Sequence, residues 1–591
     1  SLLDAIDGTV TAPGARLLSA RLNRPSTDPA EINSRLDLLT YFLNSPTSAT
    51  VRDRLKAAGD PERALSRLVL SRGGPRDLSA LRRTLTEAQN LSAILVPGPG
   101  LDVPERLAKL AEALNVQEFE GLRSLVADLE AALVEEPGLF ARDGGFIAEG
   151  WIAALDEARA LRDDSRKLIA GLQKTYSEAT GVTNLKVKHN NVLGYFVEVS
   201  ARHADPLMAH DGFIHRQTMA NAVRFTTTEL AELESKIAGA AGRALALEVE
   251  AFGGFRDRVE HNAESIRSIA RALAEIDVAA ANAEFARRAN WTRPDLAEEA
   301  VFEIESGRHP VVEAALKRDG EAGFTPNDCH MSGNGKSGAR LLLVTGPNMA
   351  GKSTYLRQNA LMIILAQAGL YVPAARARIG IADRLFSRVG AADDLARGRS
   401  TFMNEMVETA AILNQATHRS FVILDEVGRG TSTFDGLSIA WAAAEHLHEI
   451  NTCRALFATH YHEMTRLAEE LSAAGNLSLR AREWKGELVF LHQVAEGPAD
   501  RSYGIEVARR AGLPPAAIAR ATTILERLES EDAPAAALAE LPLFSAMPVA
   551  APAKPSQLSE RMKRIDPDRL SPREALDCLY ELKRLSGEDN E

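Results

Sequence analysis

Residues 341–358 read LLLVTGPNMAGKSTYLRQ, and this stretch decides the fold of the chain around it. Its apolar start predicts a buried strand, and the polar run that begins near Lys352 predicts a helix. Between them, the spacing Gly346-x4-Gly351-Lys352-Ser353 satisfies the P-loop pattern, in which backbone N–H groups and a helix N-terminus hold phosphate oxygens. The predicted phosphate site comprises Gly346, Pro347, Asn348, Met349, Ala350, Gly351, Lys352, Ser353 and Thr354.

Two side chains of this loop have distinct expected roles. Lys352 can neutralise the β- and γ-phosphate oxygens and assist catalysis, and Ser353 can ligate Mg²⁺. We therefore expect ATP or ADP with Mg²⁺ as the ligands. The alternative is a glycine turn that only joins a strand to a helix; the agreement of strand, loop and helix favours the nucleotide site.

Two carboxylates follow a second apolar run in FVILDEVGRG, residues 421–430. Asp425, at the end of this expected strand, suits Mg²⁺ directly or through water. Glu426 can polarise the attacking water, because hydrolysis needs a base in line with the γ-phosphate. Alone, two exposed carboxylates after a core strand would be the simpler interpretation; the P-loop upstream favours a catalytic pair.

Two further segments carry candidate contacts to the γ-phosphate. In ALFATHYHE, residues 455–463, a strand ends at Thr459, and His460 can reach the phosphate or the attacking water. A histidine at a strand end is often structural, so this prediction depends on the other motifs. In DDLARGRSTFMNEM, residues 393–406, Ser400 precedes a helix where hydroxyls and N–H groups can meet an anion, or where the serine only caps the helix.

The composition indicates several domains and a helix-rich architecture. A chain of 591 residues exceeds one ordinary domain, and aromatic residues make up only 5% of it. The formal net charge of -12 argues against a generally basic nucleic-acid coat but leaves a local basic patch open. Cys329, Cys453 and Cys578 lie far apart without metal-ligand spacing, which predicts reduced thiols in the cytoplasm.

Neither a membrane segment nor a leader is expected. The longest apolar runs are too short to span a bilayer, so we expect no membrane partner and a cytoplasmic location. The chain starts with Ser1 rather than Met, directly in structured-looking sequence, which indicates a fragment of a longer protein.

Hydrophobic periodicity divides the first half of the chain. Residues 1–174 repeat apolar positions at intervals of three and four, which predicts helices. Residues 175–226 contain NLKVKHNNVLGYFVEVS, whose alternation predicts a β-hairpin. Helical sequence resumes over residues 227–290. A small β insert between long helices predicts a compact tip at the end of long arms.

The second half begins with an α/β pattern and ends in helices. Residues 291–498 alternate apolar strands with helices, as in LLLVTG, FVILDE, RALFATH and ELVFLHQV, which predicts a nucleotide-binding domain. Residues 499–530 predict a helix, a GLPP turn and a second helix. Residues 531–566 are rich in Ala and Pro and predict a flexible linker. Residues 567–591 predict a last helix with an apolar face.

These segments resemble the MutS family of DNA mismatch-repair ATPases. The nucleotide part carries TGPNMAGKSTYLRQ, ADDLARGRSTFMNEM, LDEVGRGTSTFDGLSIAWA, FATHYHE and GPADRSYGIEVARRAGLP. Upstream, TVTAPGARLLSARLNRPSTDPAEINSRLDLL, RGGPRDL, NNVLGYFVEV and FIHRQTMANAVRFTTTEL resemble the core, clamp and lever segments. The asparagine of GPNMAGKST and the phrase DEVGRGTST distinguish the sequence from general transporter-type ATPases.

The resemblance implies a multidomain fold. It assigns residues 1–174 and 227–290 to the two halves of a mainly α-helical core and lever, and residues 175–226 to a small β-rich DNA clamp. It assigns residues 291–498 to an α/β ABC-type P-loop ATPase domain and residues 499–530 to a helix-turn-helix dimerisation segment. The C-terminal helical segment would add an oligomer contact that turns dimers into tetramers through residues 571–585.

The resemblance also implies ligand contacts and partners. Ser400 would act in trans at the ATP site of a second subunit, and Asn348 would contact the γ-phosphate. Phe324 and His492 would sandwich the adenine, which suits flat rings, although a core Phe and a strand-end His would be the simpler interpretation without the family. A homodimer on double-stranded DNA, a MutL-type repair partner and a nucleoid-associated location follow as expectations.

One family feature is missing from the sequence. The N-terminal mismatch-reading domain of the family carries a Phe-x-Glu wedge and is followed by a connector domain; Ser1 already aligns inside the core domain, so we expect a chain without both. Asn404 also stands where the family usually has an apolar residue in STFMxEM.

Basic residues in and beside the β insert are the expected DNA contacts, which would bind phosphates without sequence information. They are Lys186, Lys188, Arg202, Arg216 and Arg224. The alternative is a solvated mixed-charge face, since Glu198 and Asp205 lie nearby.

An apolar pentapeptide, ELPLF, runs from Glu540 to Phe544 inside the linker. It resembles the motif by which repair proteins dock on the replicative sliding clamp, although Glu540 replaces the usual Gln; a chance apolar patch is the alternative.

Three functional interpretations follow. The first is a mismatch-repair ATPase that uses ATP binding and hydrolysis to clamp and slide on duplex DNA. The second is a paralogue-like clamp on recombination junctions that does not recognise mismatches. The third is a non-catalytic scaffold, against which the intact Lys352, Asp425, Glu426 and His460 argue.

Overall fold

The computed structural model describes residues 1–95, 102–163, 165–190, 193–320, 323–332, 338–347, 350–390, 401–484, 487–498, 504–529 and 573. The chain divides into two units, Ser1–Arg501 and Ser502–Glu591, each of which is described by itself. Among the described helices, none combines the length and the apolar character needed to cross a bilayer.

The first unit begins with a helical region. Its helices are α1 (Leu2–Ile6), α2 (Ala12–Asn23), α3 (Pro29–Asn44), α4 (Ser48–Ala57), α5 (Pro61–Val69), α6 (Pro75–Leu95), α7 (Glu105–Leu114), α8 (Glu120–Ala132), α9 (Ala153–Asp163) and α10 (Ser165–Thr180). Three of them start with a proline in the first turn after a capping side chain: Thr11, Asp28 and Asp60 each accept a backbone N–H of the helix they precede.

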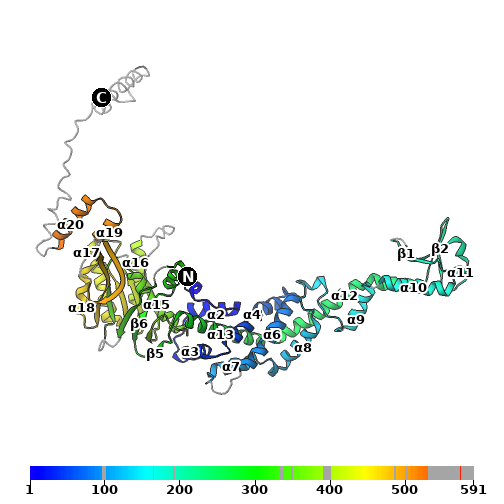
Figure 1. Ribbon diagram of the computed structural model, residues 1–591, viewed down its shortest axis with the longest axis horizontal. Helices are drawn as coiled ribbons and strands as arrows, with labels where there is room; N and C mark the ends of the chain where they lie inside the picture. The colour runs from blue at the N-terminus through cyan, green and yellow to red at the C-terminus, as the bar shows by residue number, and fades with distance from the viewer. Residues whose placement is uncertain are drawn as a thin grey trace. The chain divides into compact units, whose positions relative to one another are not determined.

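Two long helices organise this region. α13 (Ala263–Ala289) packs against α2, α3, α4, α5 and α7, and its many buried alanines allow that close packing. Buried Asp277 of α13 accepts the N–H groups of Val10 and Thr11 and so fixes the start of α2. α12 (Thr228–His261) packs against α5, α8 and α9 and also contacts β2 (Gly194–Ser200) of the insert, so it connects the helical region to the insert (Figure 1).

The insert is an antiparallel sheet in the order β1-β2-β4-β3. β1 (Lys186–Asn190) and β2 form the hairpin that the sequence predicts, and β3 (Ile214–Thr218) and β4 (Ala222–Thr226) complete the sheet. A short helix, α11 (Asp205–Met208), links β2 to β3. Val197, Val199 and Phe225 form a separate small core with residues of α10 and α12. α10 continues past the boundary expected after residue 174 and ends before Gly181, whose φ of +69° suits a helix C-terminus.

Residues beyond α13 form two sheets. One has the order β5-β9-β6-β7 and the other the order β10-β11-β12-β8-β13-β14. Their strands are β5 (Asp295–Ala297), β6 (Val301–Gly307), β7 (Asn327–Ser332), β8 (Leu341–Thr345), β9 (Arg376–Gly380), β10 (Leu385–Arg388), β11 (Phe421–Asp425), β12 (Arg454–Ala458), β13 (Ala474–Trp484) and β14 (Glu487–Glu496).

The six-stranded sheet is covered by helices on both faces. In the sheet, β10, β11, β12, β8 and β13 are parallel, and β14 pairs antiparallel with β13. Leu342 and Val344 share a core with α15 (Lys352–Gln367), whereas Leu341 and Leu343 face a core with α16 (Thr401–Gln415) and α17 (Thr433–His446). This alternation along one strand is the two-residue period of a sheet buried on both sides.

The remaining helices of the first unit are short. α14 (Pro310–Asp319) lies between β6 and β7, and α18 (Leu467–Glu470) lies between β12 and β13. Arg454 of β12 is fully buried and donates to the carbonyls of Val301, Gly380 and Arg419, which ties the two sheets together.

The second unit contains α19 (Gly504–Arg510) and α20 (Pro515–Glu529), which contact each other. Gly512 has a φ of +88°, and the N–H groups of Gly512 and Leu513 donate to the carbonyls of Arg509 and Ala508. This is a Schellman ending, which accounts for the predicted turn between the two helices. The linker, Glu540 to Phe544 and residues 574–591 lie outside the described residues.

Candidate nucleotide-binding site

The P-loop connects β8 to α15. Gly346 and Gly351 have φ values of +127° and +105°, a region that L side chains rarely adopt. Lys352, the first residue of α15, folds back so that its Nζ donates to the Gly346 carbonyl at 2.6 Å. The lysine ammonium therefore lies against the first glycine of the motif, at the position where it can meet phosphate oxygens.

Strand register brings the other motifs to the same edge of the sheet. Asp425 pairs with Ala458 across β11 and β12, and Ala458 pairs with Val344 across β12 and β8. The residues that follow each strand therefore meet at one level, because the strands are parallel. Glu426 and His460 consequently emerge beside the P-loop.

A polar cavity of about 420 Å³ lies at this edge, and its lining includes Lys352, Ser353, Asp425 and Glu426 but not His460. Ser353 Oγ donates to Asp425 Oδ2 at 2.5 Å, and Lys352 Nζ lies 3.7 Å from Glu426 Oε1. Arg429 pairs with the other oxygen of Glu426 at 2.7 Å. The cavity thus holds a lysine, two carboxylates and a hydroxyl within contact of one another.

The charge balance of the cavity suits an anionic ligand with a cation. Burial lowers the pKa of Lys352 and raises the pKa of Asp425, so both charges are unfavourable in the protein alone. Asp425 Oδ1 is buried and has no hydrogen-bond partner among the described residues. The Ser353 hydroxyl and the Asp425 carboxylate are hard oxygen donors of the kind that Mg²⁺ prefers, so these residues fit that ion.

Glu426 occupies a backbone conformation that is unusual for its residue type. Its φ is +55°, in the left-handed region, and its N–H donates to the Ala458 carbonyl at 2.9 Å. Such strain is found where surrounding contacts fix a functional side chain. His460 follows the end of β12, with its ring centroid 4.0 Å from that of Tyr461, and desolvation lowers its pKa from the ordinary 6.5, which favours the neutral ring at pH 7.

A second cavity, of about 580 Å³, also borders the P-loop, at Ala350 and Gly351. Phe324 and His492 both line it, together with Gly351 and Thr354. His492 Nδ1 is 2.8 Å from the Ala350 carbonyl, and Asn327 holds the strand on both sides of His492 through the His492 carbonyl and the Val494 N–H. Its lining is mostly apolar, as expected of a pocket for a flat ring.

The two cavities share one short segment of chain. Lys352 and Ser353 line the polar cavity, while Gly351 and Thr354 line the apolar one. A ligand with a flat ring at one end and a polyphosphate at the other matches this arrangement. The expected contacts at Asn348, Met349 and Ser400 lie outside the described residues.

Comparisons with known proteins identify the family of this chain. Residues 1–283 match the family model described as MutS domain III, residues 342–529 match MutS domain V, and residues 551–585 match the DNA mismatch repair protein MutS C-terminal region. DNA mismatch repair protein MutS of Paracoccus denitrificans (strain Pd 1222) is 55% identical over 601 residues, covering 100% of this chain and 67% of the relative. The chain belongs to the MutS family.

Two further relatives agree with this assignment. The proteins named DNA mismatch repair protein MutS from Rhizobium meliloti (strain 1021) and Rhodopseudomonas palustris (strain HaA2) are 55% and 56% identical, over 99% of this chain. The chain spans 64% of the length of each. The match to MutS domain III covers the helical region and the β insert. The match to MutS domain V begins in β8.

The β insert of this MutS chain presents fewer free cations than its sequence indicates. Lys188 Nζ lies 2.7 Å from Glu198 Oε1, and Arg224 Nε lies 3.1 Å from Glu198 Oε2. Arg224 also stacks over the Phe196 ring. Of the five expected DNA contacts, only Lys186, Arg202 and Arg216 are both exposed and without an ion pair to another described residue.

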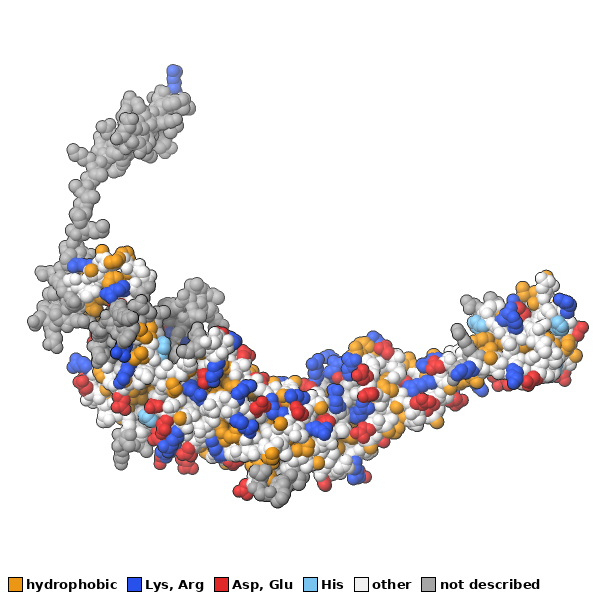
Figure 2. All heavy atoms as spheres, viewed as in Figure 1, with side chains coloured by type: hydrophobic (Ala, Val, Ile, Leu, Met, Phe, Trp, Pro, Cys, Tyr) orange, Lys and Arg blue, Asp and Glu red, His pale blue; other side chains and the backbone are white. Residues whose placement is uncertain are grey.

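The visible surface carries mixed charge. On the face drawn in Figure 2, Lys and Arg side chains are interspersed with Asp and Glu side chains over both the helices and the insert. Hydrogen bonds from Lys188 and Arg224 lower the pKa of Glu198, with Lys188 the larger cause, so Glu198 stays ionised and keeps both cations engaged.

The sequence analysis did not predict a buried ion pair that lies beside the polar cavity. Glu405 Oε1 accepts the Gly428 N–H at 2.5 Å, and Glu405 Oε2 lies 3.4 Å from Arg388 Nη2. Both side chains line the polar cavity, and both are buried. Their positions in different motifs hid the pair, although a glutamate in STFMNEM was an available signal. Asn404, at the position where the family usually has an apolar residue, is half-buried.

Proposed function

We propose that this chain is an ATPase that couples ATP binding and hydrolysis to the clamping of double-stranded DNA in mismatch repair. The single observation that carries the proposal is the pair of cavities that share the P-loop, one polar and one apolar with two rings. Membership of the MutS family and the MutS domain V match support ATP as the nucleotide. The domain is then an ABC-type ATPase, as the resemblance implies.

The residues of the polar cavity divide the chemistry of phosphoryl transfer. Lys352 neutralises charge that develops on the γ-phosphate, and the P-loop N–H groups orient the polyphosphate. Glu426 polarises the attacking water. Its left-handed backbone conformation and its ion pair with Arg429 fix the position of the carboxylate. Ser353 and Asp425 would hold Mg²⁺, which supplies positive charge to the phosphate oxygens when bound.

The roles of the remaining nucleotide contacts complete this proposal. His460 is neutral and can accept or donate a hydrogen bond at the γ-phosphate. Phe324 and His492 stack on the two faces of the adenine. Asn348, and Ser400 from a second subunit, would complete the γ-phosphate contacts in a homodimer.

The proposed route from nucleotide to DNA begins at the far end of α15. This helix starts at Lys352 and ends at Gln367, whose Nε2 donates to the Ser26 carbonyl at 2.9 Å. The Ser26 N–H donates back to the Gln367 carbonyl at 2.9 Å, and Arg35 Nη1 donates to the Ala368 carbonyl at 3.3 Å. A movement of α15 would therefore act directly on the connection between α2 and α3.

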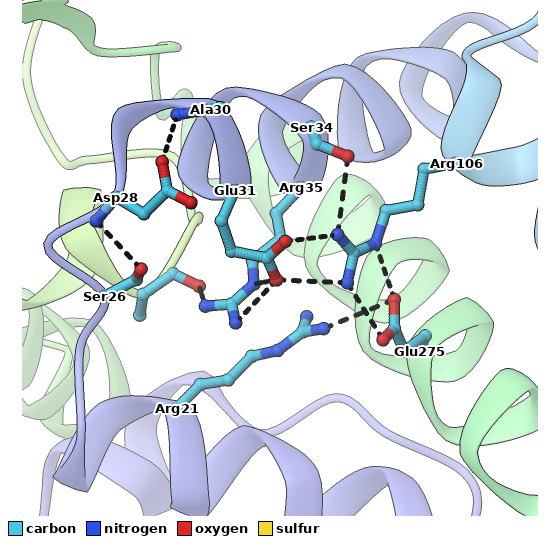
Figure 3. A network of polar contacts seen from close by, with 10 residues as sticks. Arg21, Ser26, Asp28, Ala30, Glu31, Ser34, Arg35, Arg106 and Glu275 are labelled. Atoms are coloured by element: carbon cyan, nitrogen blue, oxygen red, sulfur yellow. Dashed lines mark hydrogen bonds and ion pairs between the residues drawn. The ribbon is translucent and has the colours of Figure 1, made fainter.

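An ion-pair network continues from this connection (Figure 3). Arg35 pairs with Glu31 at 2.9 Å, and Arg106 pairs with both Glu31 and Glu275, at 2.9 Å and 2.7 Å. Arg21 also approaches Glu275, at 3.5 Å. The network joins α2, α3, α7 and α13, and α13 continues from α12, which reaches the β insert. We infer that it passes a change at the nucleotide to the insert.

DNA contact is proposed for the exposed cations of the insert. Lys186, Arg202 and Arg216 would bind phosphates, while Lys188 and Arg224 contribute less because Glu198 engages them. A MutL-type partner, docking of residues 540–544 on a sliding clamp, tetramers through residues 571–585 and a cytoplasmic, nucleoid-associated location remain proposals from the family.

The experiment for the ATPase is hydrolysis by the purified chain with Mg²⁺. We expect steady-state turnover in the wild type and loss of turnover in Lys352→Ala, because that variant removes the cation at the γ-phosphate. Arg16→Met is a matched control, since Arg16 forms ion pairs outside the network, with Asp60 and Glu62. Equal turnover in the wild type and Lys352→Ala would contradict the proposal.

A further inference from the structure

Glu405 is a buried carboxylate that the proposed chemistry does not use. It lies on α16, is 6% exposed and borders the polar cavity. Its Oε1 accepts the Gly428 N–H at 2.5 Å, and its Oε2 lies 3.4 Å from Arg388 Nη2. Because the protein engages both oxygens, the geometry assigns Glu405 to holding the walls of the cavity rather than a ligand inside it.

The loop that Glu405 contacts carries the proposed catalytic base. Gly428 follows Glu426 by two residues, and the backbone between them has three anchors. The Glu426 N–H donates to the Ala458 carbonyl at 2.9 Å, and the Gly428 carbonyl accepts the Tyr461 hydroxyl at 3.0 Å. The third anchor is the Gly428 N–H, held by Glu405. Of the three acceptors, Glu405 is the charged one, and hydrogen bonds to charged acceptors are the stronger class.

α16 approaches the same loop at a second point. A Cβ added at Gly430 would lie only 2.8 Å from Phe402 Cβ, so the loop backbone lies directly against this helix. Phe402 and Glu405 are three residues apart and therefore share one helix face. The left-handed conformation of Glu426, with its φ of +55°, persists only where surrounding contacts determine it. The face of α16 supplies such contacts.

We propose that Glu405 is a positioning residue for hydrolysis. Through the Gly428 N–H it fixes the loop that directs the Glu426 carboxylate toward the attacking water. The inference rests on the proposed ATPase function and names a residue that acts on the reaction through Glu426. The competing explanation is that Glu405 only neutralises the buried Arg388 and serves folding alone.

The first test is single-turnover hydrolysis of ATP with Mg²⁺ by the wild type and Glu405→Leu. We expect Glu405→Leu to hydrolyse about 100-fold more slowly, the usual cost of misplacing a catalytic group by about 1 Å. The affinity for ATP, measured by calorimetry, falls by about three-fold at most. In a Glu426→Gln background, Glu405→Leu changes the rate by less than about two-fold, because the group through which it acts is already gone.

The second test is a matched pair of double variants, Glu405→Gln with Arg388→Met and Glu405→Leu with Arg388→Met. Both remove the buried ion pair, and glutamine and leucine are of similar size. Only glutamine keeps an oxygen that can accept the Gly428 N–H. We expect the variant with glutamine to hydrolyse ATP at least about 10-fold faster than the variant with leucine. Equal rates would assign Glu405 to the neutralisation of Arg388 and overturn the proposal.

The remaining outcomes separate this proposal from the proposed function. If the wild type does not hydrolyse ATP, the ATPase function itself is wrong. If it does, and Glu405→Leu slows hydrolysis equally with Glu426 and with Gln at that position, the role of Glu405 is structural and the function stands. Melting temperatures without nucleotide show which variants are folded at the assay temperature. If Glu405→Leu alone is unfolded there, the double variants decide, because they leave no unpaired buried arginine.

Discussion

The N-cap of α14 makes the stability of the nucleotide part depend on pH. His309 is 7% exposed, and its Nδ1 accepts the Val312 N–H at 3.3 Å. Burial lowers the pKa of His309 from its ordinary value of 6.5 to about 4, and the charge of Arg357 acts in the same direction. Protonation of Nδ1 would remove the acceptor that caps the helix. The folded state therefore holds a neutral imidazole.

The change in the free energy of unfolding with pH follows from the difference between the pKa of His309 in the folded and the unfolded chain. Above pH 6.5 the imidazole is neutral in both states, so the stability is complete; it is lost as the pH falls from 6.5 toward 4, where the unfolded chain binds the proton first. At pH 5 the free energy of unfolding is lower by about 2 kcal/mol, at about 1.4 kcal/mol for each tenfold change in proton affinity. For a transition of about 200 residues, this lowers the melting temperature by about 4–8 °C.

The assay is thermal unfolding of the full chain by calorimetry at pH 7.5 and pH 5. His309→Asn is the matched variant, because asparagine is a good N-cap acceptor and does not titrate. Other groups lower the melting temperature of both proteins alike, so the difference between the two losses isolates His309. The wild type should lose about 4–8 °C more than His309→Asn. Equal losses in both proteins would show that His309 does not make the folded state sensitive to pH.

Three further predictions concern catalysis, DNA contact and coupling. Glu426→Gln should bind ATP normally and hydrolyse it about 100-fold or more slowly, measured by single-turnover kinetics. Lys186→Glu should weaken duplex binding and lower its salt dependence, whereas Glu198→Gln, which releases two cations, should tighten binding; unchanged binding in both salt titrations would remove the insert from the interface. Arg106→Met should keep ATP hydrolysis but reduce several-fold the effect of ATP on duplex affinity, measured by fluorescence anisotropy.

The sequence predicted the parts of the site that are contiguous or follow directly from strand ends. The P-loop spacing defines strand, loop and helix within one segment, and the structure places β8 and α15 there. Asp425 and His460 were expected at strand ends, and parallel register brings both to the edge beside the P-loop. Phe324 and His492 came from the family resemblance alone, and the structure places them in one cavity.

Other features depend on contacts that no local pattern encodes. Lys188 reaches Glu198 diagonally across two strands, which is fixed by register rather than by sequence spacing. Glu405 meets Gly428 only after α16 packs against β10 and α17, and Gln358 fits beside Gly307 only because that residue has no Cβ. The sequence predicted that the helical region ends after residue 174. In the structure α10 continues to Thr180 and ends before Gly181, whose positive φ suits a helix C-terminus.

We propose that ATP bound at this site changes how the chain holds duplex DNA. The most direct measurement is the affinity of the purified chain for a labelled duplex with Mg²⁺ and either ATP or ADP, using Glu426→Gln to keep ATP intact. We expect affinities that differ by at least about five-fold between the two nucleotides, the lower end of ordinary coupling. Equal affinities with ATP and ADP, in a protein that binds both nucleotides, would contradict it.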